Sequence, residues 1–592
     1  MSDVLIPNTS KHDVTSFTIL VDEKEVNPSY QVLSVSISKE INRIPVAQII
    51  LRDGEAADRT FAISETNDFI PGKKIKINVG RDGNNEQFFK GIIIRHAIRV
   101  KENGNGELHV ECRDQAVKMT IGRHSRYFEN VKDSEVFDQL CKYKDLSSDA
   151  EQTVLKHKEL VQHHISDWDF MLLRAEANAM LVNVNDGVIK ISKPDTSSSP
   201  VMQVTYGSTI YEFEAEIDAR QQFLNVEAKS WDYSNQELFT TETSSAGFTE
   251  HGNIPGSDIA RAINPDKKKF ELHHSGHRIE QEIKDFTDGI MLRSRLAKIR
   301  GRAKFQGFGG VKVGDMVKID GVGARFNGKA FVTAVKHDLS KGMWDTHIQF
   351  GLDPQRYAES HDDDMNDRQT AGLVGAIHGL QIGKTVQLQS DPDGEDRILV
   401  KIPVIDNAAQ GIWTRVASLD AGNGRGAFFR PEIGDEVIVG FINDDPRDAV
   451  LLGMLHSSAN PAPIKAEDAN NEKGFTTRSK MHISFNDDTK TITIDTPAGN
   501  SITLDEQGTK IEIKDQNSNK ITMDTAGIKV DSPKNVEINA GVNLTLKAAA
   551  SLTIGAATIS IKADGNVSVE GAMAKLAGQG MTEITGGIVK IN

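Results

Sequence analysis

The feature that most constrains this chain is a repeat of apolar pairs running from residue 483 to residue 569. In each pair two apolar residues flank one other residue, and successive pairs begin 7 to 10 residues apart. The pairs are Ile483/Phe485, Ile492/Ile494, Ile502/Leu504, Ile511/Ile513, Ile521/Met523, Ile528/Val530, Val536/Ile538, Leu544/Leu546, Leu552/Ile554, Ile559/Ile561 and Val567/Val569. A short, nearly constant period is typical of a solenoid or a fibre and not of a globular core.

Each repeat fits a short strand of a slender β-prism. Apolar residues alternate with Thr, Asp, Lys, Glu and Ser, and such alternation places the two kinds on opposite faces of a strand. No Trp or Tyr follows residue 475, and Phe485 is the one aromatic residue in the repeats, as expected for a narrow core. Two apolar side chains per repeat are too few to hold an isolated strand, so the strands must close into a tube.

Two closures meet this requirement. A single chain could coil so that three repeats form one turn of a monomeric β-helix. Alternatively, three identical chains could wrap around one another, each supplying one face of the prism. A trimer would remove the lateral sheet edges, which otherwise promote aggregation. The period alone is compatible with both closures.

Composition changes near residues 370 and 475 and divides the chain into four parts. We predict a mainly β protein: a hub of β-barrel domains with a few helices, a small OB-fold barrel and a C-terminal trimeric β-helix needle. The predicted boundaries are 1–370 for the hub with two barrel domains and helical insertions, 371–456 for the OB-fold, 457–475 for a linker and 476–592 for the spike.

Local patterns place the elements of the first part. Period-2 alternation predicts half-buried strands at 16–22, 30–38, 73–80 and 107–114. Capping chemistry predicts one helix from Asp133 or Ser134 and another from near Ser166.

Three further segments are less regular. We predict an amphipathic basic helix around 293–304, a long loop at 240–280 and an exposed linker at 360–372. Residues 380–456 hold five or six short apolar strands separated by Gly, Asp and Pro, which favours a small barrel.

Bulk properties exclude several classes of function. The net charge of −15 argues against nucleic acid or an anionic membrane as the main partner, because both require a basic surface. Two cysteines in 592 residues exclude a disulfide scaffold and fit a reducing cytoplasm. The N-terminus has no apolar segment of the secretory type, and no stretch approaches roughly 18 apolar residues. We therefore expect synthesis in the cytoplasm without a signal peptide.

Several segments together resemble a known family. They are DPDGEDRILVKIP (391–403), WTRV (413–416), AGNGRGAFFRPEIGDEVIVGF (421–441) and DDPRDAVLLG (444–453), with support from DWDFMLLRAEANAMLV (167–182) and VECRDQAVKMT (110–120). The chain resembles the valine-glycine-repeat (VgrG) spike proteins of type VI secretion systems, and the central spikes of contractile phage tails and extracellular injection particles.

This resemblance implies a homotrimer. Its hub would cap the inner tube and contact baseplate proteins, and its needle would puncture a target envelope when the sheath contracts. The needle would carry a PAAR-type tip protein and possible effectors. The subunit would be assembled in the injection particle and delivered outside the cell or into target cells on contraction. The tip would dock on Gly586, Gly587, Ile588, Val589, Ile591 and Asn592. Some relatives carry a catalytic domain after the barrel, and the segment 456–474 is too short for one.

Three clusters could be taken for metal sites. They are His163–His164 with Asp167 and Asp169, His273–His274, and Asp362–Asp363–Asp364. Adjacent histidines on a strand point to opposite faces, and three consecutive Asp residues lack the spaced ligands of a calcium loop. We predict no metal and no cofactor.

Catalytic signatures are equally weak. Gly422–Gly426 and Gly307–Gly310 resemble phosphate-binding loops, but the pattern that follows is not that of a helix, which such a loop requires. Cys112 and Cys141 lie on apolar faces and are expected to be buried and unreactive. No G-x-S-x-G motif occurs. We therefore predict that the chain is not an enzyme.

Two rival functions remain open. A β-helical tailspike-like enzyme that degrades glycans is the main alternative, although such enzymes usually present aromatic residues to the sugar. A surface adhesin with a fibrous stalk is the second, and it would require an export signal.

Overall fold

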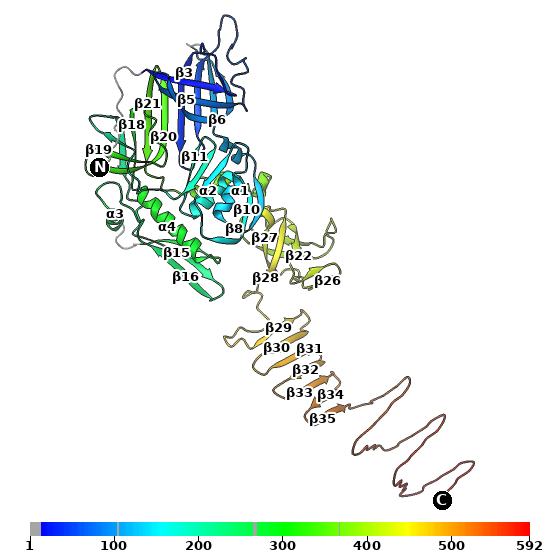
Figure 1. Cartoon of the computed structure of the whole chain (residues 1–592). Coiled ribbons are helices and arrows are strands. Elements are labelled where there is room, and N and C mark those ends of the chain that lie inside the picture. Colours follow the sequence, from blue (N-terminus) through cyan, green and yellow to red (C-terminus); the bar gives the residue numbers. More distant parts are fainter. Residues whose placement is uncertain (1–13, 103–105, 264–268, 366–367, 592) are drawn as a thin grey trace. The chain divides into compact units, whose positions relative to one another are not determined.

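Strands are the main regular structure of the chain up to residue 531, which confirms the predicted mainly β fold class (Figure 1). The structure is a computed structural model that describes residues 14–102, 106–263, 269–365 and 368–591. Residues 1–13, on which the prediction about an export signal rests, lie outside the described residues. The chain forms two compact units, 1–380 with 440–450 and 381–439 with 451–592.

A large sheet organises residues 14–365, here called the N-terminal region. All pairings in it are antiparallel except the one between β13 and β19. In spatial order the strands are β14 (Ile210–Ile217), β18 (Ile299–Gln306), β21 (Met343–Phe350), β20 (Gly328–Ser340), β3 (Val32–Glu40), β4 (Val46–Arg52), β7 (Glu107–Arg113), β6 (Asn84–Arg99), β5 (Lys74–Arg81), β1 (Thr15–Val21) and β2 (Lys24–Glu25), while β19 (Met316–Asp320) joins β20 to β13 (Met202–Thr205). The four strands predicted from alternation correspond to β1, β3, β5 and β7.

Alternation within these strands explains the cores that they form. In β3, Val35 and Ile37 are buried while the serines between them are half-buried, as a pleated strand with one core face requires. One aliphatic core lies along β1 and β3 to β7, and a second lies along β13 and β18 to β21.

A smaller module with two helices interrupts the sheet. It contains η1 (Gln115–Thr120), β8 (His124–Lys132), α1 (Asp133–Leu140), β9 (Ser147–Ala150), β10 (Lys156–Ile165), α2 (Asp167–Ala177), β11 (Leu181–Asn185) and β12 (Val188–Ser192). Both helices begin where the sequence predicts. The Ser166 hydroxyl accepts a hydrogen bond from the Asp169 N–H at 3.1 Å and so caps α2.

Residues 225–296 correct two predictions. The segment 240–280 is not a long loop: it contains the end of β16 (Glu237–Thr243), then α3 (Gly256–Ile263) and β17 (Lys269–His274), and β16 and β17 flank β15 (Asn225–Asp232) in one sheet. The predicted helix at 293–304 is also misplaced, because α4 (Glu280–Leu296) ends there and β18 begins at Ile299. Sheet pairing with β14 and β21 overrides the helical pattern of these basic residues.

The N-terminal region ends in short helical turns and not in a plain linker. They are α5 (Tyr357–Ser360) and α6 (Asp362–Met365), and η2 (Gln369–Gly372) follows this region. Among the described residues, no helix has both the length and the apolar character needed to cross a membrane.

A closed five-stranded barrel follows, in the order β22–β23–β24–β28–β27. Its strands are β22 (Gln381–Gln387), β23 (Ile398–Lys401), β24 (Ile412–Val416), β27 (Glu436–Phe441) and β28 (Ala449–Met454), with a hairpin of β25 (Ala421–Gly422) and β26 (Arg425–Gly426) and a short η3 (Ile442–Asp444). The five strands coincide with the five apolar runs of the predicted OB-fold.

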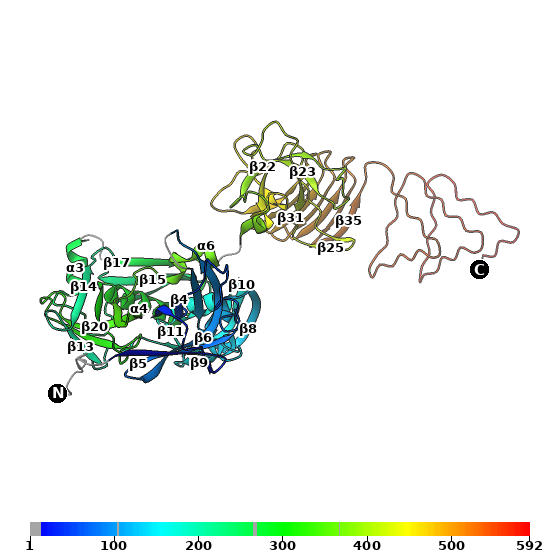
Figure 2. The same ribbon diagram turned by 90° about the horizontal axis from the view of Figure 1, so that it is seen from above.

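The repeat forms an antiparallel meander, here called the spike sheet (Figure 1, Figure 2). Its strands are β29 (Glu472–Thr476), β30 (His482–Asn486), β31 (Thr491–Asp495), β32 (Ser501–Asp505), β33 (Lys510–Lys514), β34 (Lys520–Asp524) and β35 (Gly527–Asp531). Of the described residues, those from 532 to 591 form no strand within this chain, although the apolar pairs continue through them. The predicted needle is therefore only partly ordered by contacts within one chain.

Candidate functional site

The spike sheet carries two parallel rows of apolar side chains on one face. Ile502 of β32 lies directly opposite Ile494 of β31 and Ile513 of β33, and Leu504 lies opposite Ile492 and Ile511. The register repeats from β30 to β35, so each predicted pair adds one residue to each row. Cross-strand neighbours of this kind are the unit that stabilises a sheet.

These apolar side chains are more exposed than the polar residues beside them. Ile502 is 40% exposed and Leu504 41%, while Ser501, Thr503 and Asp505 are all half-buried. The same inversion occurs in β30 and β31. A face that exposes an unbroken apolar surface normally binds another surface. A hollow of about 720 Å³ on this sheet is lined in part by Ile492, Leu504 and Ile511.

The opposite side of the spike sheet is polar and carries ion pairs between neighbouring strands. The Lys520 ammonium lies 2.5 Å from the Glu512 carboxylate, and its hydrogen bond lowers the pKa of that carboxyl. A further pair, Lys490–Glu506 at 3.2 Å, lies in the turns next to β31 and β32. The sheet therefore has one face suited to water and one suited to burial.

The predicted tip-docking residues lie in the strandless C-terminal segment. Ile588, Val589 and Ile591 are exposed, and Gly587 and Ile588 form a bend after Gly586. Asn592 lies outside the described residues. Docking of a tip protein on these residues stays a prediction.

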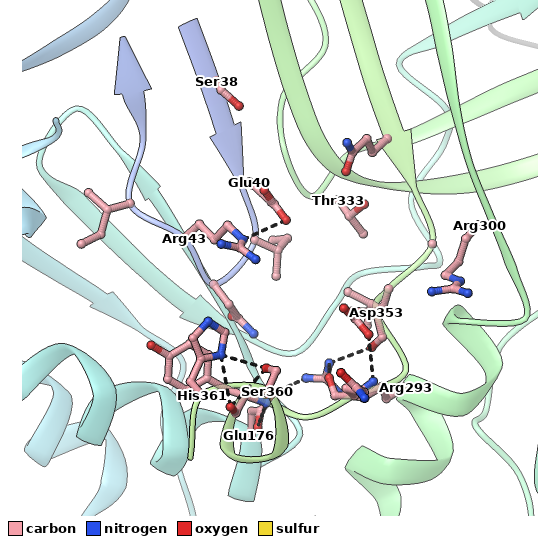
Figure 3. Close-up of a pocket in the computed structure, with 18 of the residues that line it drawn as sticks. Ser38, Glu40, Arg43, Glu176, Arg293, Arg300, Thr333, Asp353, Ser360 and His361 are labelled. Atoms are coloured by element: carbon pink, nitrogen blue, oxygen red, sulfur yellow. Dashed lines mark hydrogen bonds and ion pairs between the residues drawn. The ribbon is translucent and has the colours of Figure 1, made fainter. Parts of the chain in front are cut away.

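A polar pocket of about 560 Å³ opens in the N-terminal region (Figure 3). Four arginines line it, and each already has a carboxylate partner. The pairs are Arg43–Glu40 at 3.2 Å, Arg113–Glu111 at 2.9 Å, Arg300–Glu216 at 2.8 Å and Arg293–Glu176. The pocket wall is thus a set of matched charges.

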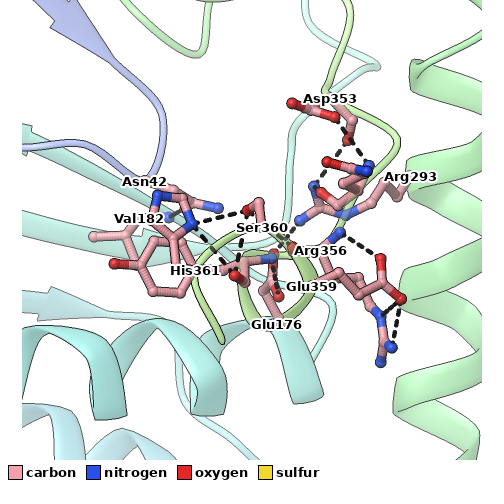
Figure 4. Close-up of polar contacts among 11 residues, drawn as sticks. Asn42, Glu176, Val182, Arg293, Asp353, Arg356, Glu359, Ser360 and His361 are labelled. Carbon is pink, nitrogen blue, oxygen red and sulfur yellow. Dashed lines mark hydrogen bonds and ion pairs between the residues drawn. The ribbon is translucent and has the colours of Figure 1, made fainter. Parts of the chain in front are cut away.

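Residues 353–365, here called the strap, contain α5 and α6, and the part from Asp353 to His361 lines this pocket (Figure 4). Arg293 of α4 donates to the carbonyls of Asp353 and Gln355, at 2.9 and 3.0 Å. Glu176 of α2 accepts the Tyr357 N–H with both carboxylate oxygens, at 3.0 and 2.9 Å. Burial raises the pKa of Glu176, and the Arg293 charge opposes that effect.

Sequence reasoning missed the strap. Arg293 and Glu176 are 117 positions apart, and no local pattern joins them. Arg293 belongs to a basic stretch for which the sequence predicts a helix at 293–304, whereas α4 spans Glu280–Leu296, and the sequence predicts a linker at 360–372.

The structure does not assemble the candidate metal clusters. Asp167 accepts hydrogen bonds from Arg126, Gln162 and Tyr143, while His163 and His164 are exposed at an irregular point of β10. Across the described ranges, no group of three or more His, Cys, Asp or Glu is placed to hold a metal ion.

The other histidine and aspartate candidates are accounted for individually. His273 contacts Glu271, and His274 contacts Arg278. Asp362 begins α6, and the side chains of Asp363 and Asp364 lie outside the described part of the chain.

The remaining candidates have structural positions. Gly422 and Gly426 belong to the β25–β26 hairpin, and Gly307 follows β18, where its N–H donates to the Trp344 carbonyl at 2.8 Å. Both cysteines are free and buried. Burial raises the pKa of both thiols, that of Cys141 to about 12, so neither has thiolate character near neutral pH.

Two protein families match parts of this chain, and one of them covers the barrel. Residues 381–456 match the type VI secretion system/phage-baseplate injector OB domain. Residues 11–341, more than half of the chain, match the family described as Alg8 N-terminal domain. The chain therefore belongs to the Alg8 N-terminal domain family.

Two curated relatives match part of the chain. The chain is 31% identical over 81 residues to the type VI secretion system spike protein VgrG3 of Vibrio cholerae, a match that covers 14% of this chain and 8% of that relative. It is 32% identical over 102 residues to VgrG4b of Pseudomonas aeruginosa, covering 16% and 11%. The matches thus span about a tenth of these relatives. The predicted resemblance to VgrG-type spike proteins is confirmed.

Solved structures of phage tail proteins are also similar to this chain. The 43 kDa tail protein of prophage MuSo2 from Shewanella oneidensis has 12% sequence identity and a TM-score of 0.43. That similarity covers 57% of this chain and 98% of the tail protein.

Proposed function

We propose that this chain is the central spike subunit of a contractile injection system, and that it acts as a homotrimer. One observation carries the proposal: the spike sheet exposes its apolar rows and half-buries its polar residues. Burying about 25 cal/mol per Å² of apolar surface is the main force that could order such a sheet. Sister copies have the same repeat and the same period, so they match these rows strand by strand.

The proposed division of labour follows the chain. Residues 1–370 form a hub that caps the inner tube and contacts the baseplate, 371–456 an OB-fold, 457–475 a linker and 476–592 the needle. The match to an injector OB domain supports this order. The needle punctures the target envelope, and its C-terminal residues hold a PAAR-type tip protein that carries effectors. The subunit is made in the cytoplasm and leaves it on contraction.

We also propose that the subunit is not an enzyme and needs no cofactor. Two relatives that it matches over part of its length are named as spike proteins, which supports a mechanical role. None of these matches favours the glycan-degrading alternative. Incubation of the purified protein with cell-wall and capsular glycans should release no sugar, and any turnover would favour that alternative.

Light scattering coupled to size exclusion tests the trimer. The full chain should elute with three times its mass of 64.9 kDa. A stable monomer at micromolar concentration would contradict the proposal, because the apolar rows would then stay in water.

A further inference from the structure

The strap is the segment through which the chain leaves the N-terminal region. Every residue from 381 onward, barrel and spike sheet included, is joined to the large sheet of the N-terminal region through residues 353–380. Any force between the spike and the N-terminal region within one chain must therefore pass along this segment or through contacts that hold it. The contacts that attach the strap to the N-terminal region therefore determine how much force this connection withstands.

The first attachment point is a guanidinium. Arg293 reaches from the end of α4 and donates through one nitrogen to two strap carbonyls, those of Asp353 and Gln355 (Figure 4). Its other terminal nitrogen bonds to Glu176 of α2. The side chains of Arg293 and Glu176 are only 13% and 8% exposed. Charge-assisted bonds in a site that excludes water are stronger than neutral bonds at the surface.

The second attachment point is Tyr357. Its N–H is bound by both oxygens of Glu176, and its hydroxyl donates to Asp169 at 2.7 Å. Arg293, Glu176 and Tyr357 thus form one connected set from α4 through α2 to the strap. Next to it, the Arg356 guanidinium lies 5.2 Å from the centre of the Phe286 ring of α4.

The third attachment point is Met365. Its side chain is buried in the core of the module that contains α1 and α2. Arg123 donates to its carbonyl at 2.8 Å. The strap is thus fixed at its start, middle and end, and three successive sets of contacts must break before it peels away.

We propose that the strap is the force-bearing anchor of the chain, and that Arg293, positioned by Glu176, fixes it to the N-terminal region. In the proposed spike, load on the needle would reach the hub through this anchor. This proposal rests on the proposed spike function in one respect, that the force on the strap comes from the needle. The attachment can be measured on one chain, whatever its oligomeric state.

Single-molecule pulling on the full-length protein tests the anchor. Handles on Glu159→Cys in β10 and Gly375→Cys beyond the strap use exposed positions, and both native cysteines are buried. Release of residues 353–365 should give a first step of at most about 45 Å, at roughly 3.5 Å per residue. In Arg293→Met, we expect the rate of this step at constant force to rise at least tenfold.

Arg302→Met is the matched control, because Arg302 pairs with Glu214 on the surface, where both side chains are about 70% exposed. It should open at the wild-type rate. Tyr357→Phe removes only the hydroxyl bond to Asp169 and should raise the rate by a smaller factor, about threefold. An Arg293→Met protein that opens at the rate of the control, or a first step longer than 45 Å, overturns the proposal. A monomer in light scattering would overturn the spike function and leave this measurement intact.

Discussion

Buried, paired charges hold the N-terminal region together at the residue scale. Asp133, at the start of α1, is 1% exposed and binds Arg174, His157 and Asn178. Burial alone would raise the pKa of Asp133, but the bonds from His157 and Arg174 outweigh it and lower the pKa below its usual range. This carboxylate thus ties α1 to β10 and α2.

Arg174→Met should strongly destabilise the N-terminal region. It leaves the Asp133 charge buried without its main partner, which typically costs about 3 kcal/mol or more. Urea unfolding followed by tryptophan fluorescence measures the loss, since Trp168 is buried in the same module. Arg220→Met is the control, because Arg220 is 82% exposed and pairs with Asp218 at the surface. Equal unfolding midpoints for the two variants would contradict the role given to Asp133.

His337 should make stability depend on pH. Its imidazole projects from β20 and is buried beside Phe88 and Trp344. Burial, with a smaller effect from the Lys39 charge, lowers the pKa of His337 to about 3. The unfolded chain takes up this proton near pH 6.5 and the folded chain does not, so stability falls as pH drops from 6.5 toward 3.

Between pH 7 and pH 5 this difference amounts to about 2 kcal/mol of unfolding free energy. Urea midpoints at both pH values should therefore fall more steeply in the wild type than in His337→Gln. The comparison uses the change with pH, so a general destabilisation by the substitution does not affect it. Parallel pH dependence in the two proteins would rule out His337 as the titrating group.

The elements owe their stability to two different sources of burial. In the N-terminal region a strand such as β3 buries its apolar face against other parts of the same chain. In the spike sheet the same alternation leaves the apolar face exposed, because no second layer of this chain covers it in the described residues. The period-2 pattern is equally clear in both, so the pattern alone does not tell which chain provides the cover.

A pair of adjacent substitutions separates the two faces of the spike sheet. Ile502→Asp places a carboxylate in the apolar row, where burial against sister chains would cost at least about 3 kcal/mol per copy. Thr503→Asp places the same group on the polar face. We expect light scattering to show dissociation or aggregation for Ile502→Asp and an unchanged assembly for Thr503→Asp. Identical behaviour of the two variants would mean that the apolar row is not an interface.

The cover that one chain gives to its own sheets decreases toward the C-terminus. The N-terminal region buries its large sheet in cores of the same chain and the barrel closes within one chain. The spike sheet is a single layer, and residues 532–591 form no strand of their own. The apolar pairs nevertheless continue to Val567/Val569. We infer that the order of the last part depends on association, since one repeat buries too little to stand alone.

Deletions within the repeat test this view on the whole assembly. Removing residues 544–551 takes out one repeat and keeps the remaining pairs in phase, so the assembly should persist with a slightly lower mass. Removing Thr545 alone makes Leu544 and Leu546 adjacent, so they point to opposite faces. We expect this single deletion to lower the melting temperature and the protease resistance of the C-terminal part. If the eight-residue deletion lowered the melting temperature and protease resistance more than the single deletion did, the assignment of these residues to a repeat would be contradicted.

Periodicity and local capping alone determined much of this protein. The spike strands, the five barrel strands, α1 and α2 follow from alternation and from residues such as Ser166, because these signals act over a few neighbouring positions. Only the tertiary structure decided that residues 299–306 form a strand and that Arg293 meets Glu176 and the strap. Those outcomes depend on partners that lie tens of positions away along the chain, up to 117 for Arg293 and Glu176, and no local pattern encodes such contacts.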